Sequence, residues 1–505
     1  MKKQIAFGAL LSYFSIALNI IAGLIYTPWM VAQIGQSNYG IYTLANSIIG
    51  LFIIDFGLSS ATARFMSKYI ADGEYGKAQD FLNAIYKLYL LIDAVIFSVL
   101  VVLFFFLEHI YTALSPAELA QLKNVYIIVA LYSVVQFPFL TQNGILTAHE
   151  KFIQLKLADV IYRIVFVGGT VFALWMGLGL YALVLVNALS GLLVIAYKAV
   201  AIFKWTPSRI YLKGANPSVY KEVVSFSSWT TVSSLAQRLV FGIIPTVLGI
   251  VSHSTEIAVF GVVTTIEGYF YTITSAINGL FMPKIARIYA GKEKQTNIMP
   301  LLLSVGKLQF FLNGLLVIGF FVLGHSFVGL WMGPDYIAAH WGVLLVVLPS
   351  MFLNTLQIAN TAMIVENKVR IRAIIDLLTG VLSFLLAFPL AKFWGMLGGC
   401  IAISVAYSCR AILYHIAHQK IMHIDIWHFA KKCYLKMSPP AVLTLACGLA
   451  LNYFIRDAGW LVFLIKGCLV VAVYCVSMFM LGLSRDEKRM VKETILKHTA
   501  TKGKA

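Results

Sequence analysis

Long apolar stretches alternate with short polar segments along the whole chain. A helix needs about 20 mostly apolar residues to cross the hydrocarbon core of a bilayer, and stretches of that length recur from end to end. This pattern predicts an all-α membrane protein with about fourteen spanning helices and no water-exposed domain. The predicted spans are 5–33, 40–63, 82–107, 122–146, 157–176, 179–203, 222–251, 257–282, 298–323, 341–365, 371–391, 394–417, 437–455 and 459–483.

Lysine and arginine concentrate in every second predicted loop. If the N-terminus is cytoplasmic, nearly all loop cations face the cytoplasm, and the outer loops hold only Lys123, Lys392 and Arg456. Positively charged loops stay on the cytoplasmic side of membrane proteins, so we expect an even number of spans with both termini in the cytoplasm.

Composition agrees with this reading. The chain is 60% hydrophobic and only 12% charged, with a formal net charge of +18. The cytoplasmic loops account for that charge, which points to anionic lipid at the inner membrane surface. A nucleic-acid partner is therefore not expected.

A faint internal repeat divides the chain into halves. Pro28, Tyr39-Gly40-Ile41 and Met66-Ser67-Lys68 in the first pair of spans correspond to Pro245, Phe260-Gly261-Val262 and Met282-Pro283-Lys284 in the seventh and eighth. Repeats in the same orientation suggest two lobes about the membrane normal with a site between them. The predicted parts are a six-helix lobe at 1–203, a basic cytoplasmic linker at 204–221, a second six-helix lobe at 222–417, two additional helices within 418–483 and a basic cytoplasmic tail at 484–505.

Three predicted spans carry polar side chains along one helical face. These stripes are Ser227, Thr231, Ser234 and Arg238; Glu267, Tyr271, Thr274 and Asn278; and Ser350, Asn354, Gln357 and Thr361. Each stripe either lines a polar cavity or forms hydrogen bonds between helices. Three stripes in one chain, one of which holds a deep arginine, favour a cavity.

Deep cations give the most specific functional indication. Arg163, Arg238 and Lys307 lie within predicted spans, where a charge is costly unless it serves a function. A cationic cavity suits an anionic substrate, and guanidinium groups match phosphate oxygens. The alternative is internal pairing of Arg163 with Asp159 and of Arg238 with Glu267.

Other charged residues lead to separate expectations. Arg410 and Lys466 lie near helix ends or on apolar helices, where we expect them to extend toward the membrane surface. Proton or sodium coupling has four acidic candidates within or beside spans, namely Asp55, Asp93, Glu267 and Asp376.

No arrangement of residues predicts catalysis. The sequence contains no P-loop and no H-E-x-x-H motif, and the six cysteines show no metal-binding spacing. We therefore expect a protein that is not an enzyme, with no catalytic residue, no metal site and no cofactor.

Two motifs near the N-terminus resemble a known family. Gly35-Gln-Ser-Asn-Tyr-Gly-Ile-Tyr42 and Asp55-Phe-Gly-Leu-Ser-Ser-Ala-Thr-Ala-Arg64 precede a basic stretch from Lys68 to Lys77. They resemble the opening of the bacterial polysaccharide flippases, which export O-antigen and capsule units. These belong to the multidrug/oligosaccharidyl-lipid/polysaccharide exporter superfamily.

The resemblance implies two six-helix bundles that open alternately to the two sides of the bacterial inner membrane, with two extra C-terminal helices. It implies a substrate, an oligosaccharide on undecaprenyl diphosphate, that moves from the inner to the outer leaflet for O-antigen or capsule synthesis. Polysaccharide polymerase and ligase proteins are the implied partners. By the same resemblance, Arg64, Arg163, Arg238 and Lys307 hold the diphosphate or acidic sugars.

Three alternatives stand beside this reading. A cation-coupled drug antiporter of the same superfamily typically has twelve helices and prefers cationic substrates, and both features argue against it. A lipid II flippase has similar chemistry, but its characteristic opening motif is not seen here. A membrane glycosyltransferase or polymerase needs catalytic groups at the outer face, where Asp335 and His340 are the main candidates.

Overall fold

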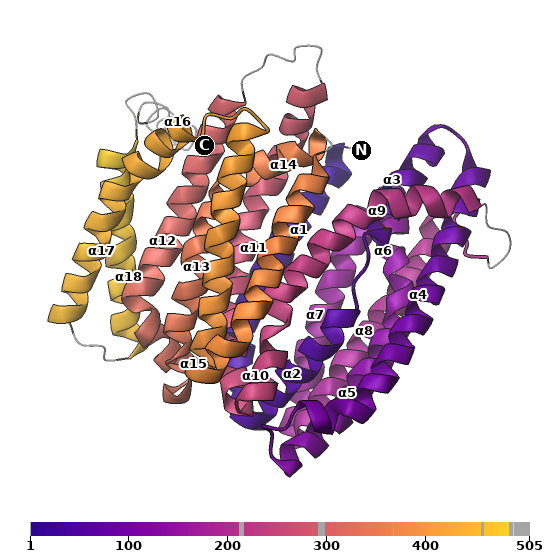
Figure 1. The fold of residues 1–505 in the computed structure, drawn as a ribbon, viewed down its shortest axis with the longest axis horizontal. Helices are drawn as coiled ribbons and strands as arrows, with labels where there is room; N and C mark the ends of the chain where they lie inside the picture. Colours follow the sequence, from indigo (N-terminus) through magenta and orange to yellow (C-terminus); the bar gives the residue numbers. More distant parts are fainter. Residues whose placement is uncertain are drawn as a thin grey trace, which may run out of the picture. The chain divides into compact units, whose positions relative to one another are not determined.

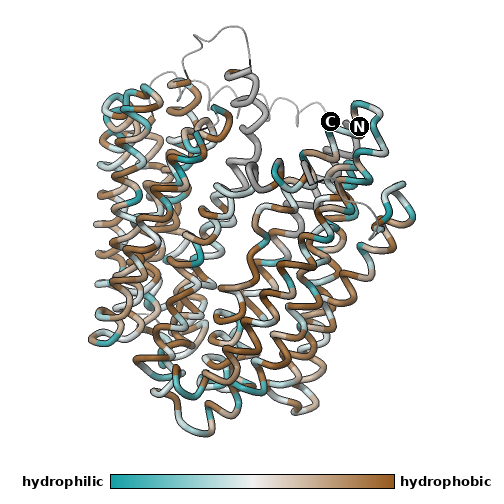
Figure 2. Tube along the Cα trace, turned by 45° about the vertical axis from the view of Figure 1, so that its right-hand side comes forward, coloured by the Kyte–Doolittle hydropathy of each residue, from teal (hydrophilic) through white to brown (hydrophobic). Residues whose placement is uncertain are grey.

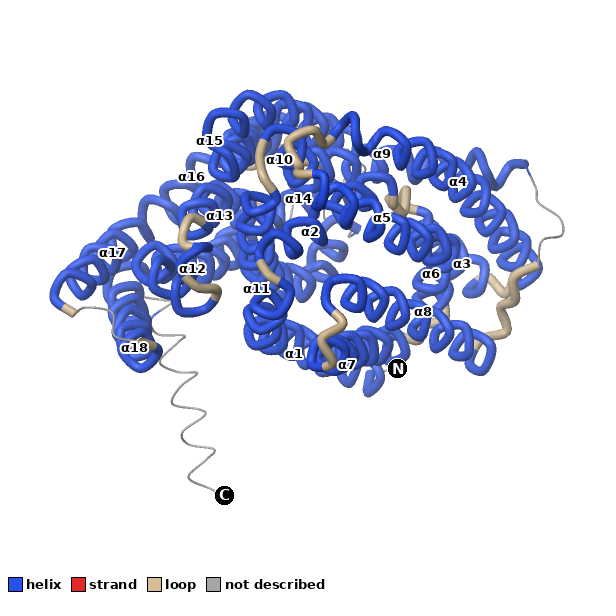
Figure 3. Tube along the Cα trace, turned by 90° about the horizontal axis from the view of Figure 1, so that it is seen from below, coloured by secondary structure: helices blue, strands red, loops and turns tan. Residues whose placement is uncertain are grey.

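The computed structural model describes residues 2–211, 217–290, 298–366, 368–455, 459–483 and 488. These residues form helices joined by short loops, and no strand occurs among them (Figure 3). The helices of the first half are α1 (Lys2–Ile34), α2 (Gln36–Phe52), α3 (Leu58–Ala71), α4 (Tyr75–Ile110), α5 (Pro116–Gln136), η1 (Phe137–Leu140), α6 (Thr141–Ala148), α7 (Phe152–Trp175), α8 (Gly179–Trp205), α9 (Pro217–Gln237), η2 (Arg238–Gly242) and α10 (Ile244–Val251). Those of the second half are α11 (Ser254–Ala290), α12 (Met299–Trp331), η3 (Pro334–Tyr336), α13 (Ala339–Thr355), α14 (Gln357–Val365), α15 (Val369–Lys420), α16 (Ile426–Ala430), η4 (Lys431–Leu435), α17 (Lys436–Phe454), α18 (Trp460–Ser477) and η5 (Met478–Gly482).

The predicted all-α, multi-spanning architecture is confirmed. Eleven helical segments of the described chain are long and apolar enough to cross a membrane, and Asn19–Ile34 is a shorter apolar helix. Hydrophobic residues predominate along the helices, as Figure 2 shows. The count of fourteen stays a prediction. α15 holds two predicted spans in one 52-residue element interrupted at Gly395, and the second predicted span is divided between α2 and α3.

The described chain separates into two compact units. Unit 1 comprises 1–264 and 369–406, and unit 2 comprises 265–368 and 407–505. These boundaries differ from those of the two predicted six-helix lobes, because the beginning of α11 and the first part of α15 pack with the N-terminal helices. The lobe boundaries remain a prediction.

Within unit 1, α2 packs against α5, α3 against α6, and α7 against both α1 and α8 (Figure 1). The contact between α3 and α6 is close because residue 144 is glycine. A Cβ atom there would lie 2.6 Å from Thr62 Cβ and 2.7 Å from the Ser59 carbonyl oxygen. Small residues allow membrane helices to approach in this way, since packing rather than water exclusion holds such helices together.

A break separates α2 from α3 in the middle of the second predicted span. Phe56 and Gly57 both adopt positive φ angles, 53° and 69°, which end the helical hydrogen-bond pattern. Broken backbone at membrane depth needs other partners. Thr231 of α9 donates from its hydroxyl to the Phe56 carbonyl at 3.0 Å. The Asp55 carboxylate accepts the Ser59 amide at 3.1 Å and the Tyr89 hydroxyl.

Unit 2 is built around α12, which packs against α13, α17 and α18. Polar bonds tie these helices together. The Tyr474 hydroxyl donates to the Phe311 carbonyl at 2.9 Å, and Lys466 Nζ donates to Asn452 Oδ1 at 3.1 Å. The expectation that Lys466 and Arg410 extend to the membrane surface is wrong. Their side chains are 1% and 4% exposed, because each is enclosed by neighbouring helices.

Candidate functional site

Unit 1 contains a polar cavity of about 740 Å³. Its walls come from α1, α2, α5, η1, α6, α7, α8 and η2, so helices that are far apart in the sequence build one site. Two of the predicted substrate-binding cations, Arg163 and Arg238, line this cavity. A third cation, Lys198, lines it as well and was not singled out from the sequence.

The three cations are held in different ways. Arg163 donates from Nη2 to the Asn19 carbonyl at 3.1 Å, and its buried Nε has no hydrogen-bond partner among the described residues. Lys198 donates from Nζ to Asn143 Oδ1 at 2.9 Å. Arg238 begins the π-helical turn η2 and has an exposed side chain. Each cation therefore retains capacity to donate to a bound anion.

The one acidic residue of the described cavity lining is Asp159. It pairs with Lys156, with Asp159 Oδ2 and Lys156 Nζ 3.2 Å apart. The alternative in which Asp159 neutralises Arg163 is not seen among the described ion pairs. Arg238 and Glu267 belong to different units, so their pairing remains untested. With three cations and one acid that is already paired, the cavity has a positive net charge.

Carboxamides and tyrosines supply the rest of the polar lining. Tyr162 donates to Asn187 Oδ1 at 2.6 Å, and Gln142 Nε2 donates to the Ile195 carbonyl at 3.3 Å. Gln142 Oε1 is buried with no partner among the described residues. The other such lining residues are Asn19, Asn46, Tyr132, Gln136 and Asn143. Carboxamides both donate and accept, which matches the hydroxyl groups of sugars.

The polar stripe of α9 has two separate roles. Thr231 donates a hydrogen bond to the Phe56 carbonyl at the break between α2 and α3, whereas Arg238 lines the cavity. Ser227 is buried, and its hydroxyl has no partner among the described residues. Ser234 is exposed and does not line the described cavity.

The remaining two predicted substrate-binding cations lie elsewhere. Arg64 is an exposed residue of α3 whose guanidinium lies 5.9 Å from the centre of the Phe65 ring. Lys307 is a half-buried residue of α12 in unit 2. Neither lines the cavity of unit 1, so the structure brings together two of the four predicted cations.

In unit 2, four polar residues form a network of hydrogen bonds between helices. Asn313 Oδ1 accepts from Thr274 at 3.1 Å and from Asn354 Nδ2 at 3.4 Å, and Gln309 donates to the Thr274 carbonyl at 3.1 Å. This network links α11, α12 and α13, as the alternative reading of the stripes expects. Gln309 and Asn313 were not singled out from the sequence.

The other unit 2 residues that the sequence predicted to line a polar cavity are not part of this network in the described hydrogen bonds. Gln357 accepts from Asn360 at 3.4 Å within α14. Tyr271 is exposed and Glu267 is half-buried. The side chain of Asn278 lies outside the described part of the chain.

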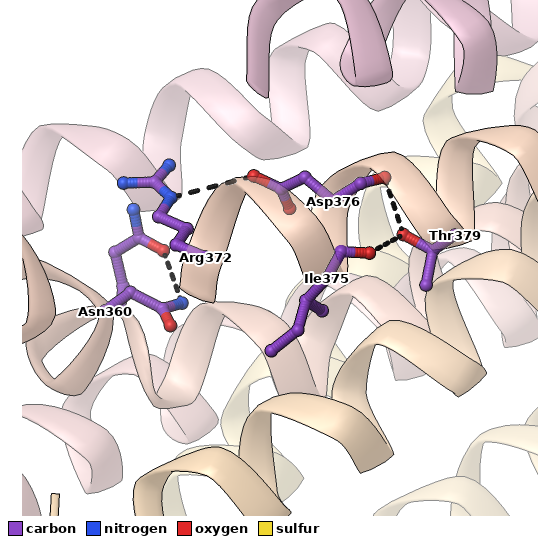
Figure 4. A network of polar contacts seen from close by, with 6 residues as sticks. Asn360, Arg372, Ile375, Asp376 and Thr379 are labelled. Carbon is purple, nitrogen blue, oxygen red and sulfur yellow. Dashed lines mark hydrogen bonds and ion pairs between the residues drawn. The ribbon is translucent and has the colours of Figure 1, made fainter. Parts of the chain in front are cut away.

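The candidate coupling acids lie in different segments of the chain. Asp55 lies at the break between α2 and α3, and Asp93 lies in α4 with its buried Oδ1 lacking a partner among the described residues. Asp376 lies 3.8 Å from Arg372 Nε one turn earlier in α15, and Thr379 donates to the Ile375 and Asp376 carbonyls (Figure 4). Asp55 accepts a hydrogen bond from the side chain of Tyr89 on another helix, α4.

Solved structures with the same fold cover most of the chain. The lipid II flippase MurJ in an inward closed conformation has a TM-score of 0.73 and 14% identity, covering 94% of this chain and 98% of that protein. An inward-facing multidrug resistance MATE family transporter of the MOP superfamily has a TM-score of 0.64 and 14% identity, covering 80% of this chain and 96% of its own. At this identity the likeness shows the fold alone.

Sequence comparison supports a family. The Bacillus subtilis (strain 168) protein described as "Uncharacterized membrane protein EpsK" is 23% identical over 532 aligned residues, covering 100% of this chain and 99% of the relative. Residues 6–289 match the family described as "Polysaccharide biosynthesis protein", a match that spans more than half of the chain. This multi-spanning membrane protein, with the fold of MurJ and MATE transporters, belongs to the Polysaccharide biosynthesis protein family.

Proposed function

We propose that this protein is a flippase that moves an oligosaccharide linked to undecaprenyl diphosphate from the inner to the outer leaflet of a bacterial cytoplasmic membrane. Such transport supplies cell-surface polysaccharide synthesis, including O-antigen or capsule. The observation that carries the proposal is the cavity of unit 1, which combines Arg163, Lys198 and Arg238 with a set of carboxamides.

The charge of the cavity favours an anionic ligand. Arginine and lysine donate charge-assisted hydrogen bonds to phosphate oxygens, which are about twice as strong as neutral ones. The carboxamides and tyrosine hydroxyls complement sugar hydroxyls. A small organic cation, by contrast, would find Asp159 as the one counter-charge in the described lining, and that carboxylate is already paired with Lys156.

The physical task also fits alternating access. A diphosphate and several sugars cannot cross about 30 Å of hydrocarbon without replacing their hydration, whereas the lipid tail can remain in the bilayer. Three cations offset charge on the headgroup without enclosing it, so release remains possible. An inside-negative potential favours outward movement of an anion by about 2.3 kcal/mol per charge per 100 mV.

Coupling to a proton or sodium gradient is part of the proposal, with Asp55, Asp93, Glu267 and Asp376 as candidates. Asp55 is the strongest because it links the α2–α3 break to Tyr89 of α4. If a proton on Asp55 drives the cycle, Asp55→Asn should lose the dependence of flipping on a pH gradient while slow equilibration continues. An unchanged gradient dependence would remove Asp55 from this role.

The test is leaflet accessibility of a lipid-diphosphate oligosaccharide in proteoliposomes, read with a membrane-impermeant enzyme that cleaves exposed sugar. We compare wild type with Arg163→Gln, Lys198→Gln and Arg238→Gln. The matched control is Lys204→Gln, which removes a lysine from the same helix as Lys198 but outside the cavity lining.

Loss of one charge-assisted contact costs about 1.5–3 kcal/mol, so each cavity variant should lower flipping at subsaturating substrate by about 10- to 100-fold. Lys204→Gln should retain the wild-type rate. If wild type moves no lipid-linked sugar but expels a small organic cation against an ion gradient, the antiporter function replaces this proposal. Equal effects of the Lys198 and Lys204 variants would contradict the role of the cavity.

A further inference from the structure

Unit 2 contains a second, chemically different hollow. A groove of about 620 Å³ lies between α12, α13 and the segment formed by α16, η4 and α17. Its walls are apolar, with Phe310, Val317, Leu348 and Met351 among the lining residues. The volume is typical of a cavity that holds a small ligand, and the absence of polar wall chemistry suits a hydrocarbon chain.

The polar groups in the groove are few and largely satisfied. The Tyr434 hydroxyl lies 2.7 Å from Thr355 Oγ1, and Ser438 donates to the Leu435 carbonyl at 3.2 Å. Of the described lining residues, only Lys431 is charged. The groove therefore offers one cation and little else to a polar headgroup.

That cation lies at one end of the groove, beside a tryptophan. Lys431 is exposed, and Trp427, one turn earlier, is 73% exposed. Tryptophan and lysine together are typical of the membrane–water boundary, where the indole ring sits at headgroup level. In the predicted topology this end faces the cytoplasm.

The lining segment from Lys431 to Ala441 is about as long as one leaflet is thick. It advances ten helical residues, about 15 Å at the α-helical rise of 1.5 Å per residue, and slightly less because Lys431–Leu435 is a π-helical turn. This is half of the roughly 30 Å hydrocarbon core. An acyl chain of an inner-leaflet lipid would follow this length while its phosphate stays at the level of Lys431.

We propose that this groove is a binding site for an anionic glycerophospholipid of the inner leaflet, with one acyl chain against α12 and α13 and the phosphate at Lys431. The site is separate from the proposed transport cavity and does not depend on it. The tail of the transported lipid is a less suitable occupant, because a diphosphate and its sugars would find one lysine and no free carboxamide in the described lining.

The test uses the purified full-length protein in detergent and native mass spectrometry with phosphatidylglycerol and phosphatidylcholine of identical acyl chains. One basic residue near an anionic lipid contributes about 1 kcal/mol, so wild type should prefer phosphatidylglycerol about fivefold at its tightest site. Lys431→Gln should abolish this preference. Lys432→Gln is the matched control, since Lys432 is also exposed but does not line the groove, and it should retain the preference.

A second variant tests the hydrocarbon part of the site. Ala441→Phe places a ring in the groove and should prevent binding of both lipids at this site, whereas the lipid-free melting temperature shows whether the variant folds. Equal effects of the two lysine variants would indicate a diffuse surface charge and overturn the proposal. Unchanged binding to a folded Ala441→Phe variant, or displacement of phosphatidylglycerol by equimolar undecaprenyl phosphate, would overturn it as well.

Discussion

The hydrogen bond from Tyr89 to Asp55 joins α4 to the break in the second predicted span, and Tyr89→Phe removes only that bond. Tyr89 is 0% exposed, and its ring packs against Phe137 with ring centres 5.3 Å apart, so phenylalanine keeps the packing. A hydrogen bond to a charged group contributes about 1.5–3 kcal/mol, although side-chain bonds between membrane helices average only about 0.6. Because the acceptor lies beside unwound backbone and Tyr89 is fully buried, we expect about 2 kcal/mol of destabilisation.

The assay is reversible unfolding in mixed micelles of increasing denaturing-detergent content. Tyr126→Phe serves as the control, since this buried tyrosine donates to a neutral acceptor, the Leu100 carbonyl, at 2.8 Å. We expect a cost of about 1 kcal/mol for that variant. A double-mutant cycle of Tyr89→Phe with Asp55→Ala isolates the pair, because alanine removes the acceptor, and should give about 1–2 kcal/mol of coupling. A coupling energy below about 0.5 kcal/mol would refute the assignment of this bond as a support of the break.

Three further outcomes are expected. Gly144→Ala should cost about 1–3 kcal/mol in the same assay, because its methyl group would meet Thr62 of α3. Gly168→Ala is the control, since no atom lies within 4 Å of its added Cβ, and it should be neutral or stabilising. Similar losses of stability for the Gly144 and Gly168 variants would contradict the close contact of α3 with α6. Asn452→Leu should destabilise by about 1–3 kcal/mol because it removes an acceptor from buried Lys466. The double variant Asn452→Leu/Lys466→Met replaces both partners by apolar groups and should recover part of that loss, and a larger loss for the double variant would contradict this reasoning. Burial and nearby Lys151 lower the pKa of His149, so the folded state favours neutral histidine and stability should fall as pH drops below about 6.5. His149→Gln should lessen this fall between pH 7.5 and 5.5, and an identical pH profile would show that other groups cause it.

The positions of most helices follow from the sequence because apolar length alone sets them. The predicted span 179–203 corresponds to α8, which runs from Gly179 to Trp205. The break inside the predicted span 40–63 was missed, since an apolar run does not reveal backbone conformation. Its only signal was Asp55 and Gly57 within otherwise apolar surroundings.

The candidate site was less accessible from sequence. Arg163 and Arg238 stood out as deep charges, but Lys198 lies near the end of an apolar helix, where lysines commonly reach the membrane surface. Its place in the cavity depends on Asn143 of α6, a helix whose separation from α5 by η1 was not predicted. A polar stripe on one helical face also does not reveal whether its residues line a cavity or bond to other parts of the chain. Thr231 and Arg238 share a face of the seventh span. Thr231 nevertheless donates a hydrogen bond to the backbone break, whereas Arg238 lines the cavity.

The π-helical turn η2 has a consequence for comparing relatives. The Ile243 amide bonds to the Arg238 carbonyl five residues earlier, at 3.0 Å, so this turn holds one residue more than an α-helical turn. At 3.6 residues per turn, one residue corresponds to about 100° of rotation. A one-residue gap opposite 238–242 in an alignment therefore marks a change in the face that the following helix presents, rather than a change in loop length. Homologous positions on either side of this turn need to be matched by helical phase as well as by residue order.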